Sequence, residues 1–269
     1  MRVAAVGAGV SGLTATKCCL EEGLEPTGFE QSRDIGGLWH YTEHVEAGRP
    51  SLCPSVISNT SKEMSVFPDF PYPEDFPVFL PDAQLLDYLW HYTERFGLQK
   101  HIKFGTTVVS IRKHPDFATT GQWDVVTETD GKQTSHVFDA VMVCSGNFSK
   151  PSLPPHGFPG IEKFQGQYFH SRRYKHPDVF QGKRVLVVGK GNSGVDIAVE
   201  ASRVAAKSPS ALRSRFVREP VLNDDLPSYI LTGRITIKPG VKEFKDNSVV
   251  FHNCPEEEPI DNRRLLHRL

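Results

Sequence analysis

The stretch "VAAVGAGVSGLTATK", residues 3–17, decides the fold, and a near-copy, "VLVVGKGNSGVDIAV", recurs at residues 185–199. Each stretch begins with an apolar run typical of a strand, passes through three glycines spaced G-x-G-x-x-G, and continues as a helix. The glycines are Gly7, Gly9 and Gly12 in the first copy and Gly189, Gly191 and Gly194 in the second. Such a turn places a helix N-terminus against a pyrophosphate, so the sequence predicts two dinucleotide-binding units.

The residues after the first copy complete a strand–helix–strand unit. "EPTGFE", residues 25–30, predicts a second strand that ends on Glu30, 18 residues beyond Gly12. A carboxylate at this place accepts hydrogen bonds from ribose hydroxyls and repels a 2′-phosphate. The first unit therefore suits FAD or NAD rather than NADP. The alternative is a glycine-rich strand–helix turn that binds no ligand.

The rest of the chain is read from periodicity and turn signals. Residues 67–81 are proline-rich and predict irregular surface, and residues 82–96 have the apolar spacing of a helix. Residues 106–146 alternate as strands do, with a hairpin turn at Asp130-Gly131 and a final apolar run, "FDAVMVCSG", typical of a buried strand. A Pro/Gly-rich boundary follows at residues 149–160, and strands resume at residues 234–252.

These patterns predict an α/β fold with two Rossmann-like dinucleotide-binding units and an antiparallel β-hairpin insertion, and the resemblance described below implies that both units are incomplete. The predicted domains are residues 1–150 for FAD, a shortened domain at 151–233 for NADPH, and remnant strands with a non-family tail at 234–269. The cofactors of the first two domains and the description of the tail follow from the resemblance described below.

Composition excludes several other classes of protein. The formal net charge of the 269 residues is -1, and the basic residues of "NRRLLHRL", 262–269, are interpreted as solvated surface or a frayed tail, so no nucleic-acid partner is predicted. The five cysteines show no C-x-x-C spacing; we expect reduced thiols and no metal site. We also expect no signal peptide and no membrane anchor.

At this point the residues match a known family: the chain resembles the flavin-containing monooxygenases of animals. The resemblance rests on "GAGVSGL", "DIGGLW", "SNTSKEM", "FDAVMVCSG", "FPGIEKFQGQYFHSRRYKHPD" and "GKGNSGVDIAVEAS". The spacing of Phe164, Gly166, His170 and Tyr174 fits the family's identifying pattern F-x-G-x-x-x-H-x-x-x-Y. The resemblance to the family covers residues 1–207 almost continuously and then residues 217–261.

The resemblance implies FAD and NADPH as cofactors and small nucleophilic amines or thioethers, with O2, as partners. NADPH would reduce the flavin, and a hydroperoxyflavin would transfer oxygen to a soft nitrogen or sulfur atom, as in N,N-dimethylaniline oxidation in xenobiotic metabolism. The implied FAD contacts are Gly7, Ala8, Gly9, Val10, Ser11, Gly12, Glu30, Gly37, Leu38, Trp39, Asn59 and Thr60. The implied NADPH contacts are Ser58, Asn59, Gly189, Gly191, Asn192, Ser193, Gly194, Val195 and Asp196, and Asn59 is the implied catalytic residue.

Some of these residues also have a purely structural interpretation. Asn59 in "SNTS" could merely cap a turn, whereas His170 is interpreted as structural. A flavin disulfide reductase would need a spaced cysteine pair near the first helix, and Cys18-Cys19 are adjacent.

The sequence departs from the family at two places. After the second glycine loop, relatives continue with a strand whose Arg receives the 2′-phosphate of NADPH; here "SPSALRSRF", 208–216, shows no strand period, and Arg213 and Arg215 are the candidates for that charge. Beyond "EEEPID" the family's flavin-completing strand and hydrophobic anchor are replaced by the basic tail.

These departures lead us to expect an internally deleted, C-terminally truncated relative that is less stable than full-length relatives and binds FAD more weakly. The family resides on the cytosolic face of the endoplasmic reticulum membrane, whereas a chain without the anchor could be cytoplasmic. The alternative to an active monooxygenase is a non-catalytic product that binds nucleotide or partners without turnover.

Overall fold

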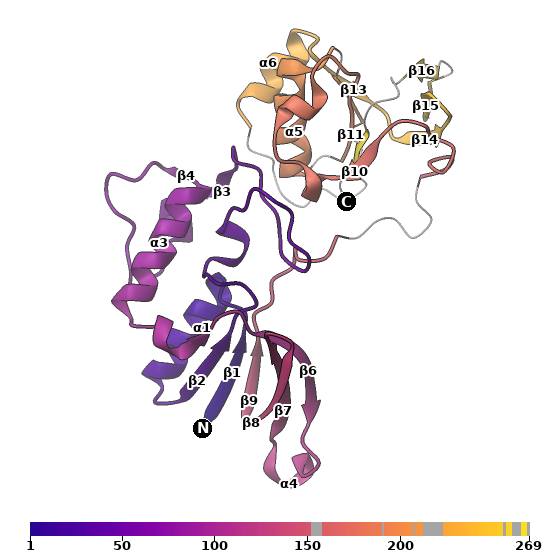
Figure 1. Cartoon of the computed structure of the whole chain (residues 1–269). Coiled ribbons are helices and arrows are strands. Elements are labelled where there is room, and N and C mark those ends of the chain that lie inside the picture. Colours follow the sequence, from indigo (N-terminus) through magenta and orange to yellow (C-terminus); the bar gives the residue numbers. More distant parts are fainter. Residues whose placement is uncertain are drawn as a thin grey trace. The chain divides into compact units, whose positions relative to one another are not determined.

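The protein divides into two compact units, Met1–Lys150 and Pro151–Leu269. The computed structural model describes residues 1–151, 158–189, 191–206, 208–211, 223–254, 257–259 and 265–267 (Figure 1). Within these ranges, the helices are all too short or too polar to span a bilayer.

The first unit is built on a parallel sheet with the order β5-β2-β1-β9. Its strands are β1 (Arg2–Val6), β2 (Glu25–Phe29), β5 (Ile102–Lys103) and β9 (Ala140–Val143). Helix α1 (Val10–Glu21) connects β1 to β2, which then pair in parallel from Arg2 with Glu25 to Val6 with Phe29. The predicted strand–helix–strand unit is therefore confirmed, and the α/β class with it.

An antiparallel sheet lies between β5 and β9 in the sequence. It consists of β6 (Thr107–Lys113), β7 (Trp123–Thr129) and β8 (Lys132–Phe138), with a short helix α4 (Phe117–Thr120) between the first two. Asp130 and Gly131 have φ angles of 49° and 75°, the left-handed pair that a two-residue hairpin turn requires, so the predicted hairpin is confirmed. Phe29 and Ala4 of the parallel sheet bury against Val125 and Phe138 of this second sheet.

Strand β9 is less buried than its apolar sequence predicts. It pairs with β1 on one side only and forms one edge of the parallel sheet in the described chain. Met142 and Val143 are 38% and 71% exposed. The prediction of a buried strand was wrong here, because apolar sequence alone does not tell a central strand from an edge strand that lacks a neighbour.

His136 on β8 gives a pH dependence to the stability of the first unit. Its ring packs against Phe29 and Phe138 with centroids 5.6 and 6.2 Å away, and burial, helped by Lys103 and Arg2, lowers its pKa below 6.5. Protonation of His136 therefore favours the unfolded chain. The contribution of the neutral ring to the free energy of unfolding is complete above about pH 6.5 and declines as the pH falls below that value.

We accordingly expect the unfolding midpoint of the protein to fall between pH 7.5 and pH 5.5, and to fall less in His136→Phe. Thermal unfolding followed by circular dichroism measures both midpoints. The same fall in both proteins would contradict the assignment to His136.

The proline-rich segment is irregular and mostly exposed, as predicted, but its aromatic side chains pack against a helix. Strands β3 (Ile57–Ser61) and β4 (Phe79–Pro81) pair as a hairpin, with helix α2 (Lys62–Ser65) after β3, and helix α3 (Asp82–Arg95) follows β4. Phe67, Phe70, Tyr72 and Phe76 pack on the buried face of α3. The apolar area of these rings favours their packing against the helix, which the proline-rich pattern did not indicate.

The second unit contains a parallel sheet with the order β10-β17-β11-β12-β13. Its strands are β10 (Tyr168–His170), β17 (Leu265–His267), β11 (Leu186–Val188), β12 (Ser208–Ala211) and β13 (Ile235–Lys238), connected in part by helices α5 (Asn192–Val204) and α6 (Asp225–Leu231). A small antiparallel sheet has β14 (Val241–Phe244), β15 (Ser248–Phe251) and β16 (Glu257–Pro259). The predicted strands of residues 234–252 are thus confirmed.

Two predictions about the second unit are corrected. Ser208–Ala211 does form a strand, parallel to both β11 and β13, although the sequence shows no strand period and contains a proline. The ladder with β11 uses Ser210 and Ala211, whereas Pro209 lies outside that ladder and is paired with Thr236 of β13.

The second correction concerns the basic tail. Leu265–His267 pairs in parallel with both β10 and β11, so these residues are not a frayed end. Three residues flanked by arginines are too short a run for the sequence to separate a strand from solvated surface.

Candidate functional site

The first glycine loop leaves β1 and enters α1 with almost no room for side chains. Gly7 has a φ of +107°, a left-handed value that glycine adopts without strain. A Cβ on Gly12 would lie 1.8 Å from the carbonyl oxygen of Gly7, so only glycine permits this approach of helix and loop. Gly9 is the N-cap of α1 and no side chain caps the helix, which leaves backbone N–H groups at this end for an anion.

Glu30 lies directly after β2 and binds the first glycine loop. Its Oε2 accepts a hydrogen bond from the N–H of Ala8 at 2.8 Å, while its Oε1 accepts from the N–H and the hydroxyl of Ser32 at 2.9 and 2.8 Å. The residue is 7% exposed. The carboxylate is therefore held beside the loop by donors of the chain itself.

The turn "DIGGLW" closes over the same loop. Gly36 N–H donates to the carbonyl of Ala8 at 3.0 Å, and a Cβ on Gly37 would lie 2.9 Å from the Cα of Gly9. The 3-10 helix η1 (Gly37–Trp39) begins at this contact. Two glycine segments 28 residues apart thus meet backbone to backbone, which fixes where η1 begins.

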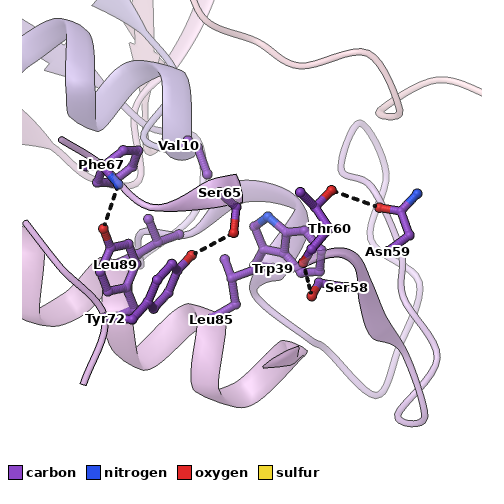
Figure 2. A pocket seen from close by; sticks show the side chains of 11 residues that line it. Val10, Trp39, Ser58, Asn59, Thr60, Ser65, Phe67, Tyr72, Leu85 and Leu89 are labelled. Atoms are coloured by element: carbon purple, nitrogen blue, oxygen red, sulfur yellow. Dashed lines mark hydrogen bonds between the residues drawn. The ribbon is translucent and has the colours of Figure 1, made fainter. Parts of the chain in front are cut away.

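A cavity of about 190 Å³ lies beside the start of α1 (Figure 2). Five residues singled out from the sequence line it: Val10, Trp39, Ser58, Asn59 and Thr60. The remaining lining residues are Ser65, Phe67, Tyr72, Leu85, Tyr88 and Leu89, none of them charged. The structure thereby brings together candidates from three separate stretches of sequence.

Ser58, Asn59 and Thr60 differ in how their side chains are used. The Ser58 hydroxyl is buried, donates to the carbonyl of Thr60 at 2.9 Å and accepts from the N–H of Leu80 at 2.9 Å. Asn59 is exposed, and its Oδ1 accepts only a long hydrogen bond, 3.5 Å, from the Thr60 hydroxyl (Figure 2). Ser58 therefore holds the hairpin of β3 and β4, while the amide of Asn59 is presented at the cavity.

The aromatic wall of the cavity was missed by reasoning from sequence. The rings of Tyr72 and Tyr88 stack with centroids 3.8 Å apart, and the Tyr88 hydroxyl donates to the carbonyl of Phe70 at 2.6 Å and accepts from the N–H of Phe67 at 3.2 Å. Burial raises the pKa of Tyr88 to about 12, so this hydroxyl remains protonated at neutral pH. The available signal was the recurrence of aromatic residues between prolines, directly before a helix with tyrosines on its apolar face.

Two lysines bind the proline-rich segment that contributes Phe67 and Tyr72 to the cavity. Lys62 Nζ donates to the carbonyls of Phe76, Glu74 and Pro73 at 2.6, 3.0 and 3.5 Å, which uses all three of its N–H groups. Lys17 on α1 pairs with Asp69 and holds the pKa of that carboxyl below its usual range. The aromatic segment is therefore tied both to the glycine-loop helix and to the β3–β4 hairpin.

The second glycine loop repeats the geometry of the first within its own unit. Gly189 has a φ of +124°, Gly191 is the N-cap of α5, and a Cβ on Gly194 would lie 2.6 Å from the carbonyl oxygen of Gly189. Asn192 and Ser193 form the start of α5, and Val195 is a buried residue of the same helix. The Asp196 carboxylate accepts a hydrogen bond from Asn223 Nδ2 at 3.0 Å. Arg213 and Arg215 lie outside the described residues.

The spaced pattern Phe164, Gly166, His170 and Tyr174 has structural contacts. The ring of Phe164 packs on Phe244, and a Cβ on Gly166 would lie 2.3 Å from that Phe164 ring. His170 Nδ1 accepts from the N–H of Arg172, and the buried Tyr174 hydroxyl donates to Glu200 of α5. His170, which the sequence suggested to be structural, thus caps the 3-10 helix η3 (Ser171–Arg173).

Comparison with known proteins identifies relatives of this chain. A family profile described as flavin-binding monooxygenase-like matches residues 1–214 and 208–263. Flavin-containing monooxygenase 1 of Mus musculus is 52% identical over 320 residues, which cover 97% of this chain and 60% of the relative. Flavin-containing monooxygenase 2 of Homo sapiens is 47% identical over the same shares. The structure of S-allyl-L-cysteine S-oxygenase from Allium sativum matches with a TM-score of 0.84 and 28% identity, covering 99% of this chain and 62% of that one.

The chain spans about 60% of the length of the curated relatives it matches. The alignment with the mouse protein runs over 320 residues, whereas 97% of this 269-residue chain is about 261 residues. About 60 residues of the relative therefore have no counterpart inside the matched region, in agreement with the predicted internal deletion.

Proposed function

This chain belongs to the flavin-binding monooxygenase-like family of oxidoreductases, whose cofactors are FAD and NADPH, and we propose that it is itself an NADPH- and O2-dependent monooxygenase of small nitrogen or sulfur nucleophiles. The observation that carries the proposal is the convergence of Val10, Trp39 and the Ser58–Thr60 stretch on one uncharged cavity at the start of α1.

The residues of the first unit fit FAD. The pyrophosphate would lie on the N-terminal turn of α1, where Gly9, Val10 and Ser11 present uncapped backbone N–H groups. Glu30 would accept hydrogen bonds from the adenosine ribose, as its place after β2 favours. The close contact of Gly9 with Gly37 leaves the approach to the loop free of Cβ atoms.

When bound, the flavin supplies the redox chemistry that activates O2, and the chain supplies binding, orientation and exclusion of water. The apolar faces of Trp39, Tyr72 and Tyr88 line the cavity and keep its water content low. The exposed amide of Asn59 is the proposed catalytic group, because it can donate and accept hydrogen bonds at the cavity mouth without a change of charge.

NADPH is proposed to bind the second unit. Its pyrophosphate would lie on the N-terminal turn of α5, formed by Gly191 to Gly194, which has the same close glycine contact as the first loop. Arg213 and Arg215 are the proposed partners of the 2′-phosphate. By the same family resemblance, the proposed location is the cytosolic face of the endoplasmic reticulum membrane.

The share of the relatives' length that this chain covers favours one alternative, a nucleotide-binding product without turnover. Purified protein tests both readings. An active enzyme shows the visible spectrum of bound FAD and oxidises NADPH faster when a tertiary amine or a thioether is added. Asn59→Ala should keep the flavin spectrum and lose the substrate-dependent oxidation. A yellow protein without that oxidation supports the alternative, and a colourless protein contradicts the proposed FAD site.

A further inference from the structure

Ser32 contacts the Glu30 carboxylate of the proposed FAD site, although no signal in the sequence indicates a role for it. Its N–H and hydroxyl both lie against Glu30 Oε1, at 2.9 and 2.8 Å, and the hydroxyl also lies 2.8 Å from the carbonyl of Asp34. The Asp34 carboxylate in turn accepts from the N–H of Ile35 at 2.7 Å, just before the "GGLW" turn. Ser32 thus connects Glu30 to the turn that closes over the glycine loop.

The two oxygens of Glu30 are used unequally. A carboxylate oxygen has two lone pairs for hydrogen bonds. Oε1 is contacted by both the N–H and the hydroxyl of Ser32, and the single proton of that hydroxyl also faces the carbonyl of Asp34, whereas Oε2 accepts one bond, from Ala8 N–H. Because two atoms of Ser32 occupy the surroundings of Oε1, we expect a further donor to approach Oε2, the oxygen beside the glycine loop.

We propose that Ser32 is a positioning residue that fixes Glu30 so that Oε2 receives a ribose hydroxyl of the dinucleotide. The inference rests on the proposed FAD site in the first unit and adds the residue that sets its selectivity for the ribose. With Ser32 in place, the carboxylate cannot turn about its last torsion without breaking a bond to Ser32 and the bond to Ala8. Without the hydroxyl, Oε1 keeps only the N–H of Ser32 beside it, and the carboxylate has more than one orientation.

Equilibrium binding of ADP and of 2′,3′-dideoxy-ADP to the full chain tests this. The two ligands differ only in the ribose hydroxyls, so their affinity ratio reports the bond to Glu30. We expect the wild type to prefer ADP roughly tenfold, as a hydrogen bond to a charged group gives. Ser32→Ala should reduce the preference to about twofold by weakening ADP, with dideoxy-ADP bound as before.

Three variants make the result specific. Ser32→Thr keeps the hydroxyl and should keep the preference, Ser135→Ala removes a hydroxyl from exposed β8 and should change nothing, and Glu30→Ala should abolish the preference. A wild-type preference in Ser32→Ala, or an equal weakening of both ligands, overturns the positioning role alone. No preference in the wild type, or an unchanged one in Glu30→Ala, overturns the proposed ribose role of Glu30 and the inference with it.

Discussion

Gly12→Val is expected to abolish FAD binding and to reduce the free energy of unfolding of the first unit by about 3 kcal/mol. The reason is the 1.8 Å between a Cβ on Gly12 and the carbonyl oxygen of Gly7. That oxygen belongs to backbone between β1 and α1, which cannot move aside as a flexible side chain would. Relief of the clash must push the helix away from the strand and so move its N-terminal N–H groups out of line with the loop.

Gly23→Ala is the matched control, because Gly23 ends the same helix and has open space around it. Its φ of +68° costs an alanine about 1 kcal/mol, but the phosphate loop is left intact, so FAD should still bind. Thermal unfolding and a titration of FAD by its fluorescence quenching measure both effects. Normal FAD binding by Gly12→Val would show that the loop is not the pyrophosphate site.

Tyr88→Ala is expected to cost about 4 kcal/mol in the free energy of unfolding and to open the cavity wall. Tyr88 is 1% exposed, stacks on Tyr72 and bonds both backbone groups that hold the aromatic segment, the N–H of Phe67 and the carbonyl of Phe70. Its loss leaves a void under the segment and two backbone groups without their partner.

Tyr88→Phe separates the contribution of the ring to the free energy of unfolding from that of the hydroxyl. The ring and its stacking remain and only the hydroxyl is lost, so about 1–2 kcal/mol is expected. Urea unfolding gives the free energies of unfolding of both variants. Equal losses in both variants would show that the hydroxyl, rather than the ring, holds the segment.

The sequence predicted the elements whose cause is local. Gly7, Gly9 and Gly12 with Glu30 were sufficient for the strand–helix–strand unit, and Asp130-Gly131 for the hairpin, because each depends on a few neighbouring residues. β12 and β17 were not predictable in this way. Their positions are set by pairing with β11, and neither Pro209 nor the arginines beside Leu265 signal a strand.

The same division applies to the candidate site. Motifs and family resemblance indicated Trp39, Asn59 and Thr60, and the structure brings these three to one cavity. Tyr72 and Tyr88 were missed because their role depends on how the proline-rich segment folds back on α3, a contact that no periodicity encodes. Ser32 was missed because its two bonds to Glu30 depend on the path of the chain after β2.

The position of β17 has a consequence for synthesis on the ribosome. β10 and β11 have no ladder with each other and are joined through Leu265–His267, which are made some 77 residues after Val188. At roughly 5–20 residues per second, β11 waits about 4–15 seconds for its neighbour. During that interval a nascent strand of Leu186, Val187 and Val188 has an open edge, which is a template for pairing with other chains. We therefore expect the second unit to need chaperone protection during translation more than the first, whose described parallel strands have all been made by residue 143.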